Sequence, residues 1–287
     1  MNGILISGNK RGYIALLETG EKVLVVPRKS LIYQKGPLYV GDYVIIDSEN
    51  SIVDFRDRIN SLIRPKIANV TYGAVVSSTI EPYFSSFLLE KYLTYLIFCG
   101  VTPLILFTKT DRLNKEEMKK IEQYAKYYKQ LGFSSYILST KKSETFDNLR
   151  EDLRGKTTVF MGQTGAGKSS AINAIDSSYN REIGEYSKAL GRGKHKTKEV
   201  ILLPFDDGLI GDTPGFSSLE LPMTLSEVAN SFPGFKGLNL DCYYSDCLHL
   251  TETKCKVKEY LKEGKISEES YANYKKLIEQ LNERKKI

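Results

Sequence analysis

Residues 162–169, Gly-Gln-Thr-Gly-Ala-Gly-Lys-Ser, have the types and spacing of a phosphate-binding loop. Glycines at these positions let the backbone curl until its N–H groups face phosphates, and the following helix adds the positive end of its dipole. Lys168 can reach the β- and γ-phosphates, and the Ser169 hydroxyl can bind Mg²⁺. An apolar strand at 157–161 and a helix at 169–175 supply the context that confirms the motif. We therefore expect nucleoside triphosphate binding through Gly162, Gln163, Thr164, Gly165, Ala166, Gly167, Lys168, Ser169 and Ser170.

A second candidate loop, Thr108-Lys109-Thr110-Asp111, follows the apolar residues 103–107. An acidic side chain can accept hydrogen bonds from N1 and N2 of guanine, and a lysine can pack along the base and ribose. The loop resembles the N-K-x-D guanine motif of GTPases, with Thr108 where asparagine is usual. Ligand-binding loops gather at strand ends in α/β sheets, which favours this interpretation over a chance charged loop. The loop that begins at Ser139 resembles the S-A-K loop that contacts the guanine oxygen through its backbone.

Asp212-Thr-Pro-Gly215 follows the expected strand at 208–210 and resembles the D-x-x-G motif of GTPases. In that motif the aspartate holds Mg²⁺ through a water molecule, and the glycine N–H contacts the γ-phosphate. Its position after a strand, downstream of the phosphate loop, favours this interpretation over an isolated turn. We expect Mg²⁺ to accompany the nucleotide, with Ser169 and Asp212 among its partners.

The order of these motifs carries information. Ordinary GTPases run from the phosphate loop through D-x-x-G to N-K-x-D, whereas here residues 108–111 come first and residues 212–215 come last. Either the match at 108–111 is accidental, which leaves a P-loop ATPase, or the domain is circularly permuted. Permutation is physically acceptable where the original termini lie close together on the surface.

Four metal-ligating residues gather near the end of the chain. Cys242, Cys247, His249 and Cys255 give the pattern C-x4-C-x-H-x5-C within fourteen residues, in a chain that has four cysteines and two histidines. Three thiolates and an imidazole suit a closed tetrahedral site for zinc, and a closed site leaves no position for water. We expect one structural zinc ion per chain. Cys99 stands alone in an apolar helical stretch and is expected to be a small buried hydrophobe.

Three groups of elements must position these residues. Strand-like stretches at 13–17, 22–26, 42–46 and 60–63, with no helix among them, predict an all-β, OB-like barrel. From residue 70, strands alternate with helices, which predicts a parallel sheet with helices on both faces. Beyond Pro222 the chain is helical apart from the cysteine cluster, with Thr224 and Ser267 as helix caps. The domain limits expected are 1–64, 65–222 and 223–287.

The composition excludes some classes of protein. The apolar and charged fractions are those of a globular protein, and no apolar run approaches the ~20 residues that span a bilayer. The first residues lack the features of a signal peptide, so a cytoplasmic location is expected. The net charge of +6 is compatible with RNA binding and equally with a mixed solvated surface.

Taken together, the permuted order, D-T-P-G-F, the stretch from Gly191 to Thr197 (Gly-Arg-Gly-Lys-His-Lys-Thr) and the cysteine pattern resemble the ribosome small subunit-dependent GTPase A family. The junction after the barrel, Arg64-Pro65 through Ala68-Asn69, is also similar. The resemblance covers nearly the whole chain. It implies an α/β P-loop GTPase core, circularly permuted, with an N-terminal OB-fold and a C-terminal zinc-binding helical domain.

The resemblance also implies a function. Such a protein is a monomeric GTPase that binds GTP, GDP and the rRNA of the small ribosomal subunit, and it hydrolyses GTP late in subunit maturation. Thr197 is then the switch threonine for Mg²⁺, because Lys196 stands where the family has threonine. Phe216 stands where Ras-like enzymes keep a catalytic glutamine, so His195 is the candidate that orients the attacking water, against the alternative of a solvated histidine. A nucleotide-gated rRNA-binding factor whose hydrolysis is incidental stays open as the second hypothesis.

Overall fold

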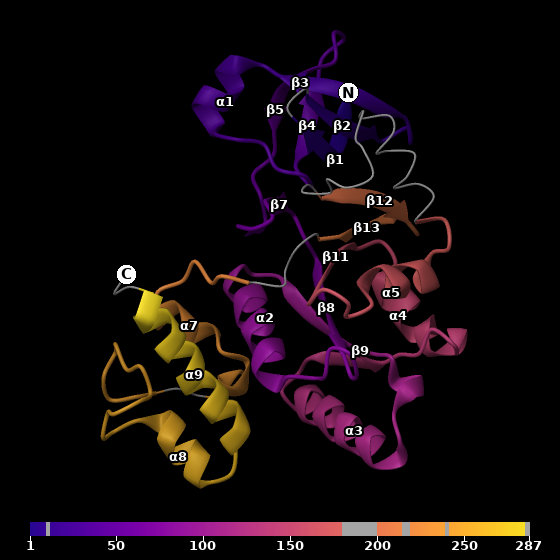
Figure 1. Ribbon diagram of the computed structural model, residues 1–287. Coiled ribbons are helices and arrows are strands. Elements are labelled where there is room, and N and C mark those ends of the chain that lie inside the picture. The colour runs from indigo at the N-terminus through magenta and orange to yellow at the C-terminus, as the bar shows by residue number, and fades with distance from the viewer. Residues whose placement is uncertain (10–11, 180–199, 214–218, 239–240, 285–287) are drawn as a thin grey trace.

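The computed structural model describes residues 1–9, 12–179, 200–213, 219–238 and 241–284. A β-barrel, a central sheet flanked by helices, and a group of C-terminal helices follow one another along the chain (Figure 1). Among the described residues, no helix combines the length and the apolar composition needed to cross a membrane. The predicted architecture of barrel, α/β core and helical C-terminal part is confirmed, whereas the domain limits stay predictions.

The N-terminal barrel is closed by five strands in the order β1-β2-β3-β5-β4. Neighbouring strands are antiparallel except β3 and β5, which pair in parallel. Alternate residues point inward, as in Leu5, Ala15, Val25, Ile46 and Ile52, and these form a core of their own. The strands are β1 (Asn2–Asn9), β2 (Gly12–Leu17), β3 (Lys22–Pro27), β4 (Tyr43–Ile46) and β5 (Ser51–Phe55).

Two expectations for this region are wrong. The barrel wall consists of strands as predicted, but the region is not free of helices, because helix α1 (Lys29–Lys35) lies between β3 and β4. This helix buries only Leu31 and has no side-chain cap, so it carries neither an apolar stripe nor an N-cap signal. The stretch at 60–63 is not a barrel strand: β6 (Ser61–Leu62) pairs with β7 (Ile67–Ala68) in a separate two-stranded sheet.

The central sheet has six strands in the order β10-β9-β8-β11-β13-β12. All of them are parallel except the edge strand β12, which forms a hairpin with β13 through Asp206-Asp207-Gly208, a sequence typical of tight hairpin turns. The predicted parallel sheet is therefore confirmed with one antiparallel edge. The strands are β8 (Tyr72–Ser78), β9 (Thr102–Thr108), β10 (Ser134–Ile137), β11 (Thr157–Met161), β12 (Ile201–Phe205) and β13 (Gly208–Asp212).

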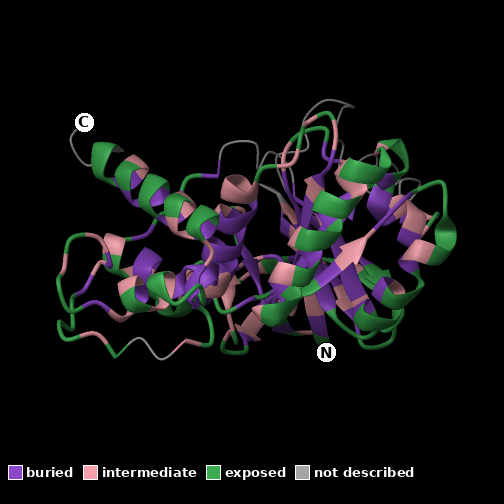
Figure 2. Ribbon diagram, turned by 90° about the horizontal axis from the view of Figure 1, so that it is seen from below, coloured by how far each residue is buried: buried purple, intermediate pink, exposed green. Residues whose placement is uncertain are grey.

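Helices cover both faces of this sheet. From β8 the chain steps through α2 to β9 and through α3 to β10, whereas α4 and α5 serve the steps toward the opposite edge. Because crossovers between parallel strands are right-handed, the two directions place their helices on opposite faces, as α2 and α5 show in Figure 1. Figure 2 shows the strands buried between helices whose outer sides are exposed. The bounds are α2 (Ser86–Phe98), α3 (Lys115–Gln130), α4 (Asp147–Leu153) and α5 (Lys168–Ile175).

The C-terminal helices pack on the outer side of α2, where α7 and α9 contact it. Thr224 and Glu227 form a capping box at the start of α7, and the Ser267 hydroxyl accepts from the N–H of Ser270 at the start of α9, so both predicted caps are confirmed. The cysteine cluster lies between α7 and α9 in sequence. The bounds are α7 (Leu225–Ser231), α8 (Lys256–Lys262) and α9 (Glu268–Arg284).

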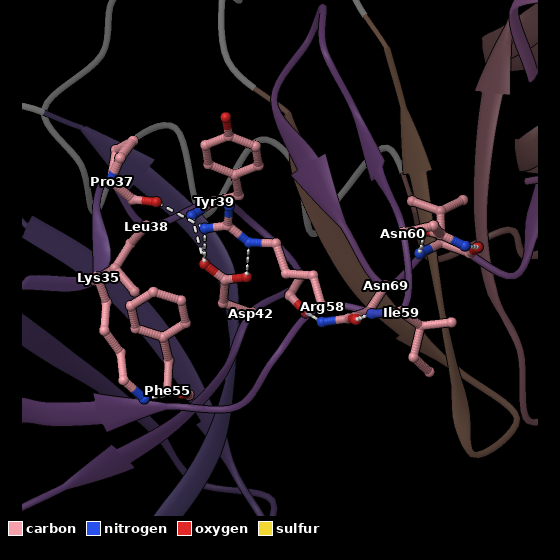
Figure 3. Close-up of polar contacts among 12 residues, drawn as sticks. Lys35, Pro37, Leu38, Tyr39, Asp42, Phe55, Arg58, Ile59, Asn60 and Asn69 are labelled. Carbon is pink, nitrogen blue, oxygen red and sulfur yellow. Dashed lines mark hydrogen bonds and ion pairs between the residues drawn. The ribbon is translucent and has the colours of Figure 1, made fainter. Parts of the chain in front are cut away.

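A polar joint connects the barrel to the sheet (Figure 3). The Arg58 guanidinium donates to both carboxylate oxygens of Asp42, at 2.7 and 2.8 Å, and it lies 3.8 Å from the centre of the Tyr39 ring. The Asp42 side chain is fully buried. Three residues before β8 begins, the Asn69 amide donates to the carbonyl of Gly41 at 2.9 Å. These contacts fix the loop that precedes β4 against the chain that enters β8.

Candidate functional site

The predicted loops meet at one edge of the central sheet. The strands β8, β9, β10, β11 and β13 are parallel, so their carboxyl ends lie at the same edge. The candidate base loop follows β9, Ser139 follows β10, the candidate phosphate loop follows β11, and Asp212 ends β13. The structure therefore brings together the described residues that the sequence singled out for nucleotide binding.

The candidate phosphate loop curls tightly between β11 and α5. Gly162, Gly165 and Gly167 have φ values of 145°, 78° and 93°, a region that side-chain-bearing residues rarely adopt. A Cβ at Gly162 would lie 2.3 Å from the carbonyl oxygen of Val76 on the neighbouring strand, so only glycine fits there. The middle of the loop, Thr164 and Gly165, is exposed. An exposed curl at a helix N-terminus is the geometry that receives an anion.

The Lys168 side chain lies along this loop. Its ammonium donates to the carbonyls of Gly162 and Gln163, at 3.0 and 3.1 Å. Burial lowers the pKa of Lys168, and the charge of Asp212 acts in the opposite direction. A phosphate at this point would give the ammonium a charged partner in place of two carbonyls.

Thr108 connects the base loop to the phosphate loop. Its hydroxyl donates to the carbonyl of Ala166 at 2.7 Å, and its own carbonyl accepts from the hydroxyl and the N–H of Thr79, at 2.8 and 3.2 Å. A threonine at this position thus joins the two loops although the motif usually has asparagine. Sequence reasoning missed Thr79, which follows β8; its place at the end of a buried strand was the available signal.

The Asp111 carboxylate lies next to Ser139, as the base-reading interpretation requires. The Ser139 hydroxyl donates to one carboxylate oxygen at 3.1 Å, and the Lys141 ammonium lies 3.0 Å from the other. The hydrogen bond from Lys141, and then that from Ser139, hold the pKa of Asp111 below its usual value, so the group is ionised at neutral pH. The Thr110 hydroxyl donates to the carbonyl of Leu138 at 2.9 Å and ties the two loops together.

Lys109 has a left-handed backbone conformation, with φ of 61°. Its ammonium donates to the carbonyl of Glu81, and the Glu81 carboxylate pairs with Arg112 at 2.7 Å. Glu81 belongs to the loop after β8 and was not predicted from the sequence. This loop therefore fixes the end of the Lys109 side chain.

Asp212 and Ser169 form the candidate magnesium site. The Ser169 hydroxyl donates to one oxygen of Asp212 at 3.0 Å. The other oxygen, Oδ1, is buried and has no hydrogen-bond partner among the described residues. Burial raises the pKa of Asp212, whereas Lys168 and Ser169 lower it. A buried carboxylate oxygen without a donor is a position that a hydrated cation satisfies. Three other predicted site residues lie outside the described residues: Thr197 for magnesium, Gly215 for the γ-phosphate and His195 for the attacking water.

The four C-terminal ligands lie together as the sequence predicted. The sulfur atoms of Cys242, Cys247 and Cys255 lie 3.7, 3.3 and 3.5 Å from Nδ1 of His249, and all four ligand atoms fall within 4.8 Å of one another. Zinc–sulfur and zinc–nitrogen bonds of about 2.3 and 2.0 Å at tetrahedral angles place sulfur and nitrogen about 3.5 Å apart. The Cys3His cluster therefore has the donor set and spacing of a closed zinc site.

The backbone around His249 is held by the last helix. The hydroxyls of Tyr271 and Tyr274 on α9 donate to the carbonyls of His249 and Leu248, at 2.8 and 2.6 Å. The Glu252 carboxylate accepts from two backbone N–H groups of the same loop. Such contacts orient the ligands, so the cluster and α9 stabilise one another.

This fold and the loops at its edge define a P-loop GTPase in which the base loop precedes the phosphate loop, a circular permutation. Residues 55–222 match the family described as RsgA GTPase. The chain belongs to this family, and it is a GTP hydrolase.

Relatives and solved structures agree over nearly the whole chain. It is 36% identical over 282 residues to the small ribosomal subunit biogenesis GTPase RsgA of Bacillus velezensis, covering 96% of this chain and 95% of that one. It is 40% identical over 242 residues to the protein of that name from Latilactobacillus sakei, covering 82% and 81%. The crystal structure of YjeQ from Thermotoga maritima superposes with a TM-score of 0.83 at 30% identity over 98% of both chains. That of YloQ, described as a circularly permuted GTPase, superposes with a TM-score of 0.80 at 30% identity over 99% and 95%.

Proposed function

We propose that this chain couples GTP hydrolysis to late maturation of the small ribosomal subunit. The observation that carries the proposal is the single sheet edge on which the base loop, the phosphate loop and Asp212 meet. The Bacillus velezensis relative, which matches over 95% of its own length, is named for small-subunit biogenesis, and this name supports the assignment of the biological role. A protein with this role acts in the cytoplasm, and we propose that it does so as a monomer.

GTP is the substrate that this edge fits. The ionised Asp111 accepts from guanine N1 and N2, Lys109 packs along the base, and the Ser139 loop contacts the guanine oxygen. The phosphate-loop residues from Gly162 to Ser170, with the N–H of Gly215, hold the phosphates. Lys168 then exchanges its two carbonyl partners for phosphate oxygens. GDP occupies the same contacts without the γ-phosphate.

Magnesium accompanies the nucleotide in this proposal. Ser169, Asp212 and Thr197 would hold the ion, and Oδ1 of Asp212, which has no hydrogen-bond partner among the described residues, is the atom that a magnesium-bound water would satisfy. When bound, the ion would supply positive charge that neutralises the phosphate oxygens. Ser169 and Asp212 already lie in hydrogen-bond contact, so two of the three protein groups are in place before the ion arrives.

One zinc ion is proposed for Cys242, Cys247, His249 and Cys255. The donor set leaves no open position, so the ion is structural and takes no part in hydrolysis. It would bind the cluster loop to α9 through the ligands and the two tyrosine hydroxyls that hold the backbone at residues 248–249.

His195 is the proposed group that orients the attacking water, because Phe216 has no polar atom for this role. Both residues lie outside the described residues, so the proposal rests on the sequence and the family. We expect His195→Ala to abolish the hydrolysis that small subunits stimulate while GTP affinity stays unchanged. A normal stimulated rate in that variant would identify the ribosome as the source of the catalytic group.

Multiple-turnover phosphate release, measured with and without small ribosomal subunits, tests the function. We expect slow intrinsic turnover and a strong stimulation by small subunits. Binding to the subunit, through rRNA contacts of the barrel and of Lys188 to Lys198, should weaken as salt rises, because phosphate contacts release counterions. Maturation that proceeds normally with a hydrolysis-deficient, GTP-binding variant would favour the second hypothesis, a nucleotide-gated rRNA-binding factor.

A further inference from the structure

Tyr179 is a buried tyrosine whose hydroxyl reaches the end of the strand that carries Asp212. Its side chain is 1% exposed and belongs to the core of the central sheet. The backbone N–H of Asp212 donates to the Tyr179 hydroxyl at 2.7 Å, although the two residues are 33 positions apart. This contact could not be predicted from the sequence, because Tyr179 belongs to none of the nucleotide-binding motifs.

The turn that carries Tyr179 is itself well fixed. Just beyond α5, the Asp176 carboxylate accepts from the N–H and the hydroxyl of Ser178, both at 2.8 Å. The N–H of Tyr179 donates to the carbonyl of Asp176 at 3.3 Å. The tyrosine ring thus starts from a closed turn at the end of the helix that begins with the phosphate loop.

Asp212 is held from three directions. The Ser169 hydroxyl contacts its carboxylate, and the next residue, Thr213, donates through its N–H and its hydroxyl to the carbonyl of Phe160, at 3.1 and 2.7 Å. Tyr179 supplies the third contact, on the N–H of Asp212 itself. Only two rotatable bonds join the carboxylate of an aspartate to its backbone. The orientation of the backbone therefore limits the directions in which Oδ1 can point.

We propose that Tyr179 is a positioning residue, which sets the affinity for magnesium by holding the backbone of Asp212 in the orientation that points its carboxylate at the ion. This inference rests on the proposed magnesium role of Asp212 and Ser169. The contact closes a ring of interactions that runs from Ser169 along α5 to Tyr179, on to Asp212 and back to Ser169. The Ser169 hydroxyl and the Asp212 carboxylate are therefore held relative to each other through the core.

The chemistry of a neutral phenol suits this role. Burial, and the nearby charge of Asp212, raise the pKa of Tyr179 well above its usual value, so the hydroxyl stays neutral at pH 7. A neutral oxygen can accept from the N–H without repelling the carboxylate. Its acceptor role also leaves the carboxylate of Asp212 free for the ion.

The test is the magnesium dependence of GTP hydrolysis in Tyr179→Phe. Loss of one hydrogen-bond acceptor should raise the magnesium concentration for half-maximal activity about three- to tenfold, the range of a single buried hydrogen bond. GDP affinity measured in the presence of a chelator should stay unchanged, because no magnesium contributes to it. Tyr179→Leu also lacks the hydroxyl and should show the same shift, so either variant decides the question if the other fails to fold.

Tyr95→Phe is the matched control. Tyr95 is fully buried, and its hydroxyl accepts from the N–H groups of Ile63 and Arg64, at 2.9 and 3.1 Å, in the connection between the barrel and the central sheet. This variant should lose stability and keep the wild-type magnesium dependence. An equal magnesium shift in Tyr95→Phe, or wild-type dependence in both Tyr179 variants, would overturn the inference. Unchanged magnesium dependence in Asp212→Asn would instead overturn the proposed magnesium site.

Discussion

At the scale of single residues, the site depends on carboxylates whose surroundings differ. Asp111 is ionised beside Lys141 and Ser139, at the surface of the base loop. Asp212 is largely buried, and one of its oxygens has no hydrogen-bond partner among the described residues. The first is suited to accept from a neutral base, and the second to hold a hydrated cation. We therefore propose that the same residue type serves two tasks, because burial and neighbours differ.

Replacing the hydrogen-bond acceptor at position 111 should change which nucleotide base the protein prefers. In Asp111→Asn a hydrogen-bond donor replaces one acceptor, so GTP should bind about a hundredfold more weakly or worse, and xanthosine triphosphate should bind better. Competition binding with the two nucleotides measures this. Asp147→Asn serves as the control, because it removes an exposed carboxylate on α4, and this variant should bind GTP normally. Unchanged GTP affinity in Asp111→Asn would remove Asp111 from the base site.

At the scale of elements, two short connections determine how the parts are held. The joint at Arg58 and Asp42 fixes the barrel to the chain that enters the sheet, and the Cys3His cluster fixes its own loop to α9. Each connection combines buried apolar neighbours, such as Val40 at the joint and Phe235 at the cluster, with a few polar or ligand contacts that hold its geometry. Both are accordingly sensitive to single substitutions.

Removal of Arg58 should destabilise the protein strongly. Arg58→Ala leaves the fully buried carboxylate of Asp42 without its charged partner, which costs about 3–5 kcal/mol in comparable pairs. The control is Arg28→Ala, since the Arg28–Asp47 pair has the same 2.7 Å contact with the arginine side chain 55% exposed, and such pairs contribute about 1 kcal/mol or less. Denaturant unfolding distinguishes the two. Equal losses in both variants would contradict a special role for the joint.

The metal cluster should be separable from nucleotide binding. Cys247→Ser should lower the zinc content from about one ion per chain and loosen the C-terminal helices, while GTP affinity stays nearly unchanged, because the cluster and the sheet edge share no residues. Elemental analysis and limited proteolysis measure the two effects. Cys99→Ser lies outside the cluster and should retain full zinc. Stoichiometric zinc in a variant that lacks both Cys242 and Cys255 would refute the ligand set.

At the scale of the whole molecule, α2 connects the central sheet to the C-terminal helices. One of its residues, Glu90, is buried against α9, where its carboxylate accepts from Ser270 at 2.6 Å and from Asn273 at 2.8 Å. Glu269 on α9 and Tyr128 on α3 also face this group. A buried carboxylate thus lies where three helices from two parts of the molecule meet.

Stability should fall between pH 4.5 and pH 7 because of this group. Burial, and then the charge of Glu269, raise the pKa of Glu90 from 4.5 to about 7 against the hydrogen bonds from Ser270 and Asn273. The folded protein keeps a proton that the unfolded chain releases in this window, so the loss reaches about 3 kcal/mol above pH 7. Unfolding measured at pH 5.5 and pH 8 should show a smaller difference in Glu90→Gln. The exposed Glu122→Gln should behave as the wild type, and an unchanged pH dependence in Glu90→Gln would contradict the assignment.

The sequence by itself determined the class of the molecule. The phosphate loop, the order of the motifs and the ligand pattern are local, because each depends on residue types at fixed short spacings. The elements beside the phosphate loop also carry local signals: the strand predicted at 157–161 and the helix predicted at 169–175 are confirmed to within one residue. By contrast, α1 was missed because a seven-residue helix that buries a single residue has no apolar stripe to detect.

Only the tertiary structure decided which distant residues support the site. Thr79 reaches Thr108 across 29 positions, Tyr179 reaches Asp212 across 33, and Glu90 reaches Ser270 across 180. Thr79, Tyr179 and Glu90 lie in no motif. Each of them contacts a partner that comes near only after the sheet and the helices have packed. Hydrogen bonds act over about 3 Å, so a spacing along the sequence contains no information about them until the fold exists.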